Sequence, residues 1–204
     1  DTLECGAIVN ALICDGEVAE RLEAGQEGEI ILSTTPFYAE MGGEVGDTGI
    51  IFAGESVARV LDTKAPEAGL TVHKVKIESG SFSVGEEVTA SVDAKRRASI
   101  ARNHTCTHIL HAALREVLGA HVKQAGSYVG PDRLRFDFTH FEALTPEQIA
   151  QVEELANSYI MQAIPTTRYE TSLDEARNSG VTALFGEKYG ETVRVVEVGQ
   201  FSRE

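Results

Sequence analysis

The pattern of the chain changes at Asp93, and this change constrains the fold more than any other feature of the sequence. Before Asp93, short runs rich in Val, Ile and Leu alternate with clusters of Gly, Asp, Glu and Pro, which predicts strands joined by tight turns. Several short strands with frequent turns are typical of a small barrel. The expected strands are Ala7–Leu12, Glu29–Leu32, Gly49–Phe52, Ala58–Asp62, Thr71–Ile77 and Glu87–Val92.

From Asp93 onwards, helical and strand patterns alternate. A long helix is expected up to Leu118, with Asp93 as its N-cap and Gly119 at its C-terminal end. Hairpin-joined strands with helices packed on them predict an antiparallel sheet in an α+β fold, with two domains at 1–92 and 93–204. The further elements are hairpin strands Ala120–Val129 and Leu134–Phe138, a helix capped by Thr145 and reaching Gln162, strand Pro165–Glu170, a short helix after Ser172 and strand Thr192–Val198.

Three of the 6 histidines, His104, His108 and His111, lie close together in the long helix. At about 100° per residue, His104 and His108 lie about 40° apart on one face, and His111 falls close to the same line. Two such imidazoles can bind one metal ion, although a structural zinc site needs four ligands. The alternative is a pair of histidines satisfied by carbonyl groups of the core. Cys106 lies on the opposite face, where we expect a small buried residue and not a ligand.

A loop rich in glycine, from Thr35 to Gly49, stands out among the predicted strands. Its glycines permit positive φ angles and close approach of the backbone. The loop therefore lies either against a ligand or a neighbouring domain, or it forms a tight corner of the barrel. We expect Asp47 to brace it by accepting hydrogen bonds from backbone amides.

Composition restricts the partners and the compartment. Lys and Arg number 18 against 32 Asp and Glu, a formal net charge of −14, which argues against strong autonomous binding to nucleic acid. Three scattered cysteines without a C-x-x-C pair favour a reducing, cytoplasmic setting, and no apolar run approaches the roughly 18 residues of a membrane span. The candidates for local contact with nucleic acid, against the alternative of a solvated helix face, are Lys95, Arg96, Arg97 and Arg102.

Five motifs, in order along the whole chain, resemble the editing region of the bacterial alanyl-tRNA synthetase family. They are the glycine-rich loop with Phe37-Tyr38, Asn103-His104-x-x-Thr107-His108, Gln124-x-Gly126-Ser127, Arg135-Phe136-Asp137-Phe138 and Ala183-Leu184-Phe185-Gly186-Glu187-Lys188-Tyr189-Gly190. The resemblance implies a small N-terminal β-barrel packed on an α/β editing domain, the second additional domain that threonyl- and alanyl-tRNA synthetases share.

The resemblance also implies a chemistry. Its family attaches alanine to tRNA(Ala) with ATP, and its editing module hydrolyses tRNA(Ala) that carries serine or glycine, because a small apolar pocket separates such amino acids by only about 10²-fold. Zn2+ would be held by His104, His108 and a later Cys-x-x-x-His pair, either to activate water or to hold the amino acid. Thr107 and Gln124 match positions that select the substrate. The alternative for Thr107 is a hydrogen bond to the backbone of its own helix, and the alternative for Gln124 is a side chain that is only solvated.

Within the glycine-rich loop, Gly42, Gly43 and Asp47 fit the family's pattern, and we take them as candidates for contact with the substrate. Met41 and Glu44 depart from it, because similar sequences carry Ser and Gln there. These two departures weaken an assignment of chemistry to the loop.

On the long helix, we take Arg102 as a candidate for contact with the acceptor end of tRNA(Ala). The chain ends at Glu204, before the family's Cys-x-x-x-His motif, so we expect a piece of a longer synthetase whose aminoacylation and C-terminal domains are further partners. Two alternatives stay open: a catalytically silent module that docks tRNA or serves the structure, and a free-standing trans-editing deacylase.

Overall fold

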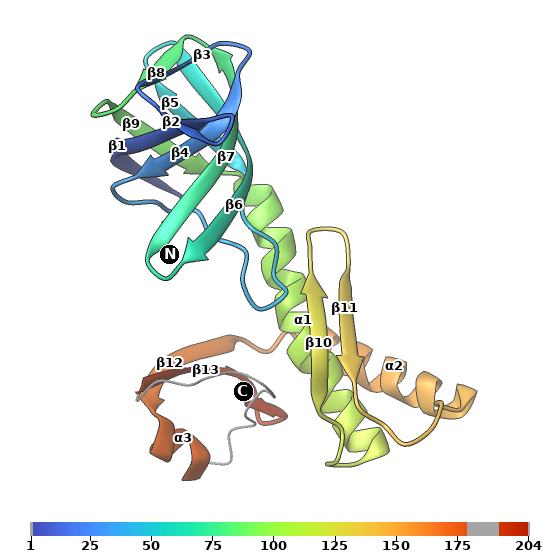
Figure 1. Cartoon of the computed structure of the whole chain (residues 1–204). Helices are drawn as coiled ribbons and strands as arrows, with labels where there is room; N and C mark the ends of the chain where they lie inside the picture. The colour runs from blue at the N-terminus through green and yellow to red at the C-terminus, as the bar shows by residue number, and fades with distance from the viewer. Residues whose placement is uncertain (1, 179–191, 204) are drawn as a thin grey trace. The chain divides into compact units, whose positions relative to one another are not determined.

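The computed structural model describes residues 2–178 and 192–203, so the last of the five motifs, at 183–190, lies outside the described residues. The chain divides into two compact units, Asp1–Ile100 and Ala101–Glu204, and the long helix α1 (Ala94–Leu118) contributes to both (Figure 1). Within the described ranges, no helix is long and apolar enough to cross a membrane.

The first unit is a closed, antiparallel β-barrel (Figure 1). Its strands pair in the order β1-β4-β7-β6-β5-β9, and β9 pairs again with β1, which closes the sheet. The barrel predicted from the sequence is thereby confirmed, and each expected strand is present. The strands are β1 (Glu4–Cys14), β4 (Glu27–Leu32), β5 (Gly49–Ala53), β6 (Ser56–Glu67), β7 (Leu70–Ser79) and β9 (Glu87–Val92).

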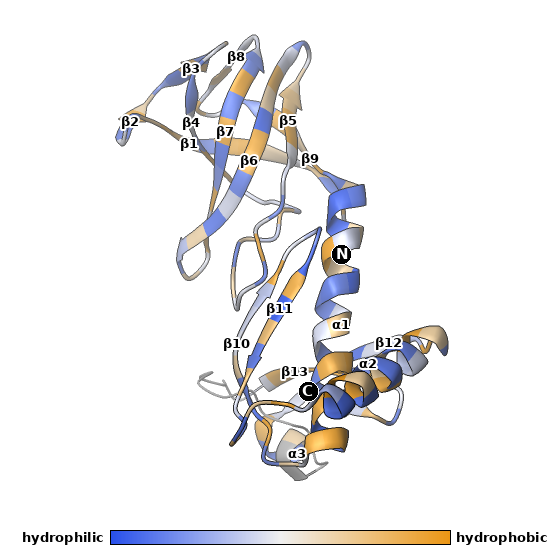
Figure 2. Ribbon diagram, turned by 90° about the vertical axis from the view of Figure 1, so that its right-hand side faces the viewer, coloured by the Kyte–Doolittle hydropathy of each residue, from blue (hydrophilic) through white to orange (hydrophobic). Residues whose placement is uncertain are grey.

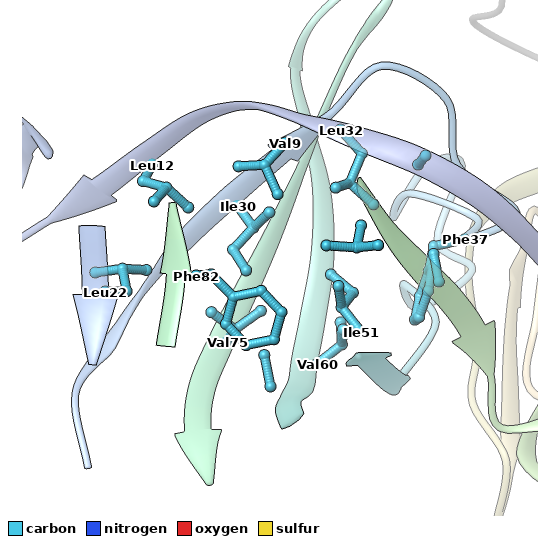
Figure 3. Close-up of a cluster of buried hydrophobic side chains, with 14 of the residues drawn as sticks. Val9, Leu12, Leu22, Ile30, Leu32, Phe37, Ile51, Val60, Val75 and Phe82 are labelled. Carbon is cyan, nitrogen blue, oxygen red and sulfur yellow. The ribbon is translucent and has the colours of Figure 1, made fainter. Parts of the chain in front are cut away.

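Side chains that alternate along the barrel strands form the core of this unit (Figure 3). In β1, Ala7 and Val9 are buried whereas Ile8 is exposed, because successive side chains of a strand point to opposite faces. Three short strands were not predicted: β2 (Glu17–Ala19), β3 (Arg21–Glu23) and β8 (Ser81–Ser83). The last two pair with each other and bury Leu22 and Phe82 in the core.

His73 is a buried polar residue that joins the barrel wall to the start of the glycine-rich loop. Its Nδ1 lies 2.9 Å from the Ile30 carbonyl oxygen, and its Nε2 lies 2.8 Å from Thr35 Oγ1. Because a carbonyl oxygen can only accept, Nδ1 carries the proton and Nε2 accepts from the Thr35 hydroxyl. Thr35 Oγ1 in turn accepts from the Phe37 amide at 3.1 Å. Burial lowers the pKa of His73, so the ring is held neutral.

The second unit begins with the remainder of α1, against which a β-hairpin and a second helix pack. Its sheet elements are antiparallel, and β12, β13 and β14 form a separate three-stranded sheet, so the α+β class is confirmed. The remaining elements are β10 (Gln124–Val129), β11 (Leu134–Phe138), α2 (Pro146–Met161), β12 (Thr166–Ser172), α3 (Leu173–Asn178), β13 (Thr192–Val198) and β14 (Ser202–Arg203).

The helix ends predicted from capping residues agree with the structure. Asp93 Oδ1 accepts from the Arg96 amide at 2.9 Å, and Gly119 follows α1 with a φ of +115°, a conformation that favours glycine. Thr145 and Gln148 form the expected reciprocal capping box of α2. The expected start of the first hairpin strand at Ala120 is wrong, because the chain after Gly119 first turns and the strand begins only at Gln124.

Tyr159 of α2 joins three segments of the second unit. Its hydroxyl donates to Glu116 of α1 at 2.6 Å, and its ring stacks on Phe201 with the centroids 3.9 Å apart. Burial and the bond to Glu116 raise the pKa of Tyr159 to about 12, so the hydroxyl keeps its proton and donates.

We expect the stability of the barrel to fall in acid because of His73. Its pKa is lowered in the folded state, so below about pH 6.5 the unfolded chain binds a proton that the folded chain excludes. The contribution is complete above that pH and is lost as the pH falls towards the folded pKa, by at most about 1.4 kcal/mol per pH unit. Urea unfolding at several pH values measures this slope.

His73→Leu should flatten the slope, whereas Thr35→Val should lower stability but retain the slope, since the ring still titrates. An unchanged slope in His73→Leu would assign the acid sensitivity to other groups.

Candidate functional site

The histidine pair lies on α1 as the spacing predicts. The rings of His104 and His108 are one turn apart and nearly parallel, with centroids 5.3 Å apart and planes inclined by 18°. His104 is exposed, whereas His108 and His111 are buried. One side of the pair is therefore open to solvent and the other is enclosed by the second unit.

Thr107 is buried beside this pair, and its hydroxyl donates to the His104 carbonyl at 2.6 Å. The sequence left open whether Thr107 bonds to its own helix, and the structure shows that it does. Since the single hydroxyl proton is used, the oxygen retains only its capacity to accept a hydrogen bond.

The β10–β11 hairpin lies along the same part of α1 (Figure 1). Asn103 Nδ2 donates to the Gly130 carbonyl in the hairpin turn at 2.8 Å, and the ring of His111 contacts Phe136 at a centroid distance of 5.2 Å. Because Thr107 lies between Asn103 and His111 on the helix, these two contacts enclose it between α1 and the hairpin.

The register of the hairpin decides which side chains face the helices. Phe136 and Phe138 pack against a buried cluster formed by α1, α2 and Val122, and in Figure 2 the colours of β11 alternate accordingly. Ser127 is directly opposite Phe136, and Gln124 is directly opposite Phe138. Opposite residues of an antiparallel pair share a face, so both polar side chains lie on the helix-facing side.

Gln124 reaches that face through an irregularity. The pairing shifts by one residue between Gln124 and Gly126, so a β-bulge there turns Gln124 inward and leaves Ala125 exposed. No role was predicted for Ser127 from the sequence. Its helix-facing position follows from its pairing with Phe136, and local sequence does not fix that register.

The residues present fit part of a zinc site. His104 and His108 supply two imidazoles from one helix face, a ligand type that zinc accepts. Among the residues that the structure describes, no group of three or more His, Cys, Asp or Glu is placed to hold a metal. The further ligands expected after Glu204 stay a prediction.

Cys106 is half-buried on α1 and is a free thiol, as are Cys5 and Cys14. Burial raises the pKa of the Cys106 thiol, so at neutral pH it is protonated and a poor metal ligand. The residue is less buried than the sequence led us to expect.

A second cluster of predicted residues lies in the first unit, at the base of the glycine-rich loop. Asp47 is 2% exposed, and its carboxylate accepts from the Tyr38 amide at 2.7 Å, which is the bracing that the sequence predicts. Arg97 Nε donates to Asp47 Oδ1 at 2.8 Å while its Nη2 donates to Oδ2, a two-pronged geometry that suits a guanidinium. Burial lowers the pKa of Arg97, and Glu44 opposes this effect.

The glycines of this loop have two different roles. Gly42 and Gly43 form an exposed two-residue turn between Met41 and Glu44, with φ angles of +61° and +88°, and a Cβ on Gly42 would meet no atom within 4 Å. A Cβ on Gly46 would instead lie 2.2 Å from the Thr63 carbonyl oxygen. The base of the loop is thus a tight corner of the barrel, and its tip is open.

The basic cluster predicted on α1 is divided by these contacts. Arg96 Nη1 donates to the Gly46 carbonyl at 2.8 Å, and Arg97 also donates to the Pro36 carbonyl at 2.9 Å. Arg96 and Arg97, two of the candidates for contact with nucleic acid, thus direct their guanidinium groups to the loop, a role that the sequence did not predict. Lys95 and Arg102 are the exposed members of the cluster.

Comparison with known proteins gives one family and one set of relatives. The family model described as "tRNA synthetases class II (A)" matches residues 1–96. The chain is 53% identical to the alanine–tRNA ligase of Acetivibrio thermocellus over 201 residues, which cover 98% of this chain and 23% of that protein.

Two further alanine–tRNA ligases match the whole chain. That of Pelotomaculum thermopropionicum is 50% identical over 204 residues, and that of Petrotoga mobilis is 48% identical over 204 residues; each match covers 100% of this chain and 23% of the relative. The chain thus spans about a quarter of the length of the relatives it matches.

We expect Arg97→Met to destabilise the first unit by about 3 kcal/mol or more, because it leaves the buried Asp47 carboxylate without its charged partner. Arg97→Lys should recover part of this loss, since it restores the charge but not the two-pronged geometry. Urea unfolding measures both. Lys95→Met, at an exposed neighbouring position, is the matched control and should change the free energy of unfolding little. Equal losses in Arg97→Met and Lys95→Met would contradict a stabilising ion pair.

Proposed function

This chain belongs to the alanyl-tRNA synthetase family, and we propose that it is the editing module, which hydrolyses tRNA(Ala) mischarged with serine or glycine. We further propose that the complete protein joins alanine to tRNA(Ala), as the names of its relatives indicate for them. The observation that carries the editing proposal is the enclosure of Thr107, beside His104 and His108, between α1 and the face of the hairpin that also carries Gln124 and Ser127.

Thr107 supports selection of serine over alanine. Its oxygen accepts but does not donate, because its proton is held by the His104 carbonyl. The hydroxyl of a seryl group can donate to this oxygen, whereas the methyl group of an alanyl group would leave it unpaired at a cost of about 1–3 kcal/mol. A site built to bond a hydroxyl discriminates in this way more strongly than an apolar pocket does.

Gln124 and Ser127 add groups that can both donate and accept on the opposite wall. They can orient the ester and the amino group of the substrate relative to Thr107. Removal of glycine needs a different argument, since glycine has no hydroxyl to donate to Thr107. Like alanine, glycine would leave the Thr107 oxygen unpaired, so its removal has to depend on other groups of the site.

His104 and His108 are the residues that would hold zinc. A bound zinc ion would supply Lewis-acid chemistry for ester hydrolysis. The chain's own contribution is to present both imidazoles one turn apart, with His108 buried and His104 at the open side. His111 packs on Phe136 and so helps to fix the helix against the hairpin.

Contact with tRNA is proposed at Lys95 and Arg102, the exposed members of the basic cluster. Two cations neutralise few phosphates, and the formal charge of −14 opposes binding. Most of the affinity for tRNA is therefore expected from other parts of the parent protein. The tRNA-docking alternative predicts that Arg102→Ala weakens binding while deacylation is absent throughout.

Thr107→Val should lower the preference for Ser-tRNA(Ala) over Ala-tRNA(Ala) by about tenfold or more, because it removes the acceptor and retains the side-chain shape. The measurement is kcat/KM for deacylation of both substrates by the parent synthetase. Thr107→Ser keeps the hydroxyl and should retain the preference. An equal preference in Thr107→Val and the unaltered protein would exclude the acceptor role.

His104→Ala should reduce the bound zinc in the parent synthetase, measured as metal per protein after dialysis. Asn103→Ala, one residue away, weakens a contact with the hairpin but removes no ligand, so its zinc content should be unchanged. Unchanged zinc in His104→Ala would reject the ligand assignment and favour the silent docking module.

A further inference from the structure

We infer that the hydrogen-bonded pair of His121 and His140 is a register lock that holds Gln124 on the helix-facing side of the hairpin. Both residues lie outside the paired strands, His121 before β10 and His140 after β11. The pair positions Gln124, and the consequence of this for editing rests on the proposed function.

The hairpin contains two registers. On the side nearer the turn, Ser127 is opposite Phe136 and Gly126 is opposite Asp137. Beyond the bulge, Gln124 is opposite Phe138. If the first register continued without a bulge, Gln124 would be opposite Thr139. It would then share the outer face with Asp137, since a slip of one residue moves a side chain to the other face.

Few backbone contacts maintain the second register. The Thr139 amide donates to the Lys123 carbonyl at 3.0 Å, and the Lys123 amide donates to the Thr139 hydroxyl at 3.3 Å. The strands themselves end at Gln124 and Phe138, one residue short of this pair. A short strand end with so little pairing is weakly specified by its backbone alone.

The bond between His121 and His140 adds the missing constraint. His121 Nε2 lies 2.9 Å from His140 Nδ1, and the ring planes are inclined by only 23°. Imidazole nitrogens bond in the plane of the ring, so one ring donates its proton to the other edge to edge. Phe141 stacks on His121 with the centroids 4.5 Å apart and restricts rotation of that ring.

This bond exists only in the bulged register. Without the bulge Lys123 would lie opposite His140 in place of Thr139, so His140 would move along the strand by one residue, about 3.3 Å. A hydrogen bond of 2.9 Å cannot extend by that amount. Loss of the bond therefore releases the constraint that turns Gln124 inward.

Isosteric variants test the lock. His140→Leu removes the bond, whereas His140→Asn keeps a polar group at the position of Nδ1. In the same way, His121→Leu removes the bond and His121→Gln keeps a polar group at the position of Nε2. The first readout is the set of proton contacts between Lys123 and Thr139, and between Gln124 and Phe138, measured by NMR on this chain.

We expect the two Leu variants to lose these contacts and the Asn and Gln variants to retain them. If His140→Leu does not fold, His121→Leu carries the test. Retention of both contacts in a folded Leu variant overturns the lock.

The second readout is deacylation of Ser-tRNA(Ala) by the parent synthetase. His140→Leu should lower kcat/KM to the level of Gln124→Ala, about tenfold, and combining the two should add nothing. A further loss in the double variant would show that His140 does not act through Gln124. If the unaltered protein does not deacylate Ser-tRNA(Ala), the proposed function fails, and the NMR contacts still decide whether the lock exists.

Discussion

The helix α1 is the constraint on which both groups of candidate residues depend. Its first turns place Arg96 and Arg97 against the base of the glycine-rich loop, and its later turns place Asn103 and His111 against the hairpin. Because helical geometry fixes which residues share a face, a substitution that breaks α1 would disturb both groups at once. Its length is secured by a capped start at Asp93 and a glycine at its end.

Features that depend on local sequence were predictable. The barrel strands follow from alternation, and α1 and α2 follow from capping residues together with periodicity. The strand β8, Ser81–Ser83, was not predictable, since three residues cannot show an alternating pattern. Closure of the barrel through the pairing of β1 with β9 joins the two ends of the unit, and short-range patterns do not specify such long-range pairing.

The candidate residues show the same limit. The spacing of His104 and His108 placed them correctly on one face. The ion pair of Arg97 with Asp47 was not predicted, because Asp47 lies 50 residues earlier in the chain. A cluster of basic residues has the same sequence pattern whether it binds phosphate or a buried carboxylate. The zinc, the substrate and the roles of Thr107 and Gln124 stay predictions, which the structure makes more specific without testing them.

A two-stranded hairpin is only marginally stable by itself, so the precision of the proposed site has to come from contacts that hold the hairpin to α1. These contacts are spread along its length: Asn103 holds the turn, His111 packs on Phe136 in the middle, and Arg115 donates to the Val122 carbonyl near the base. Each of them fixes the position of the hairpin as a body. None of them distinguishes the bulged register from the regular one at the base, because that choice depends on how β10 and β11 face each other there. The inward direction of Gln124 is therefore a separate property of the fold, and it requires an interaction that joins the two strand ends directly.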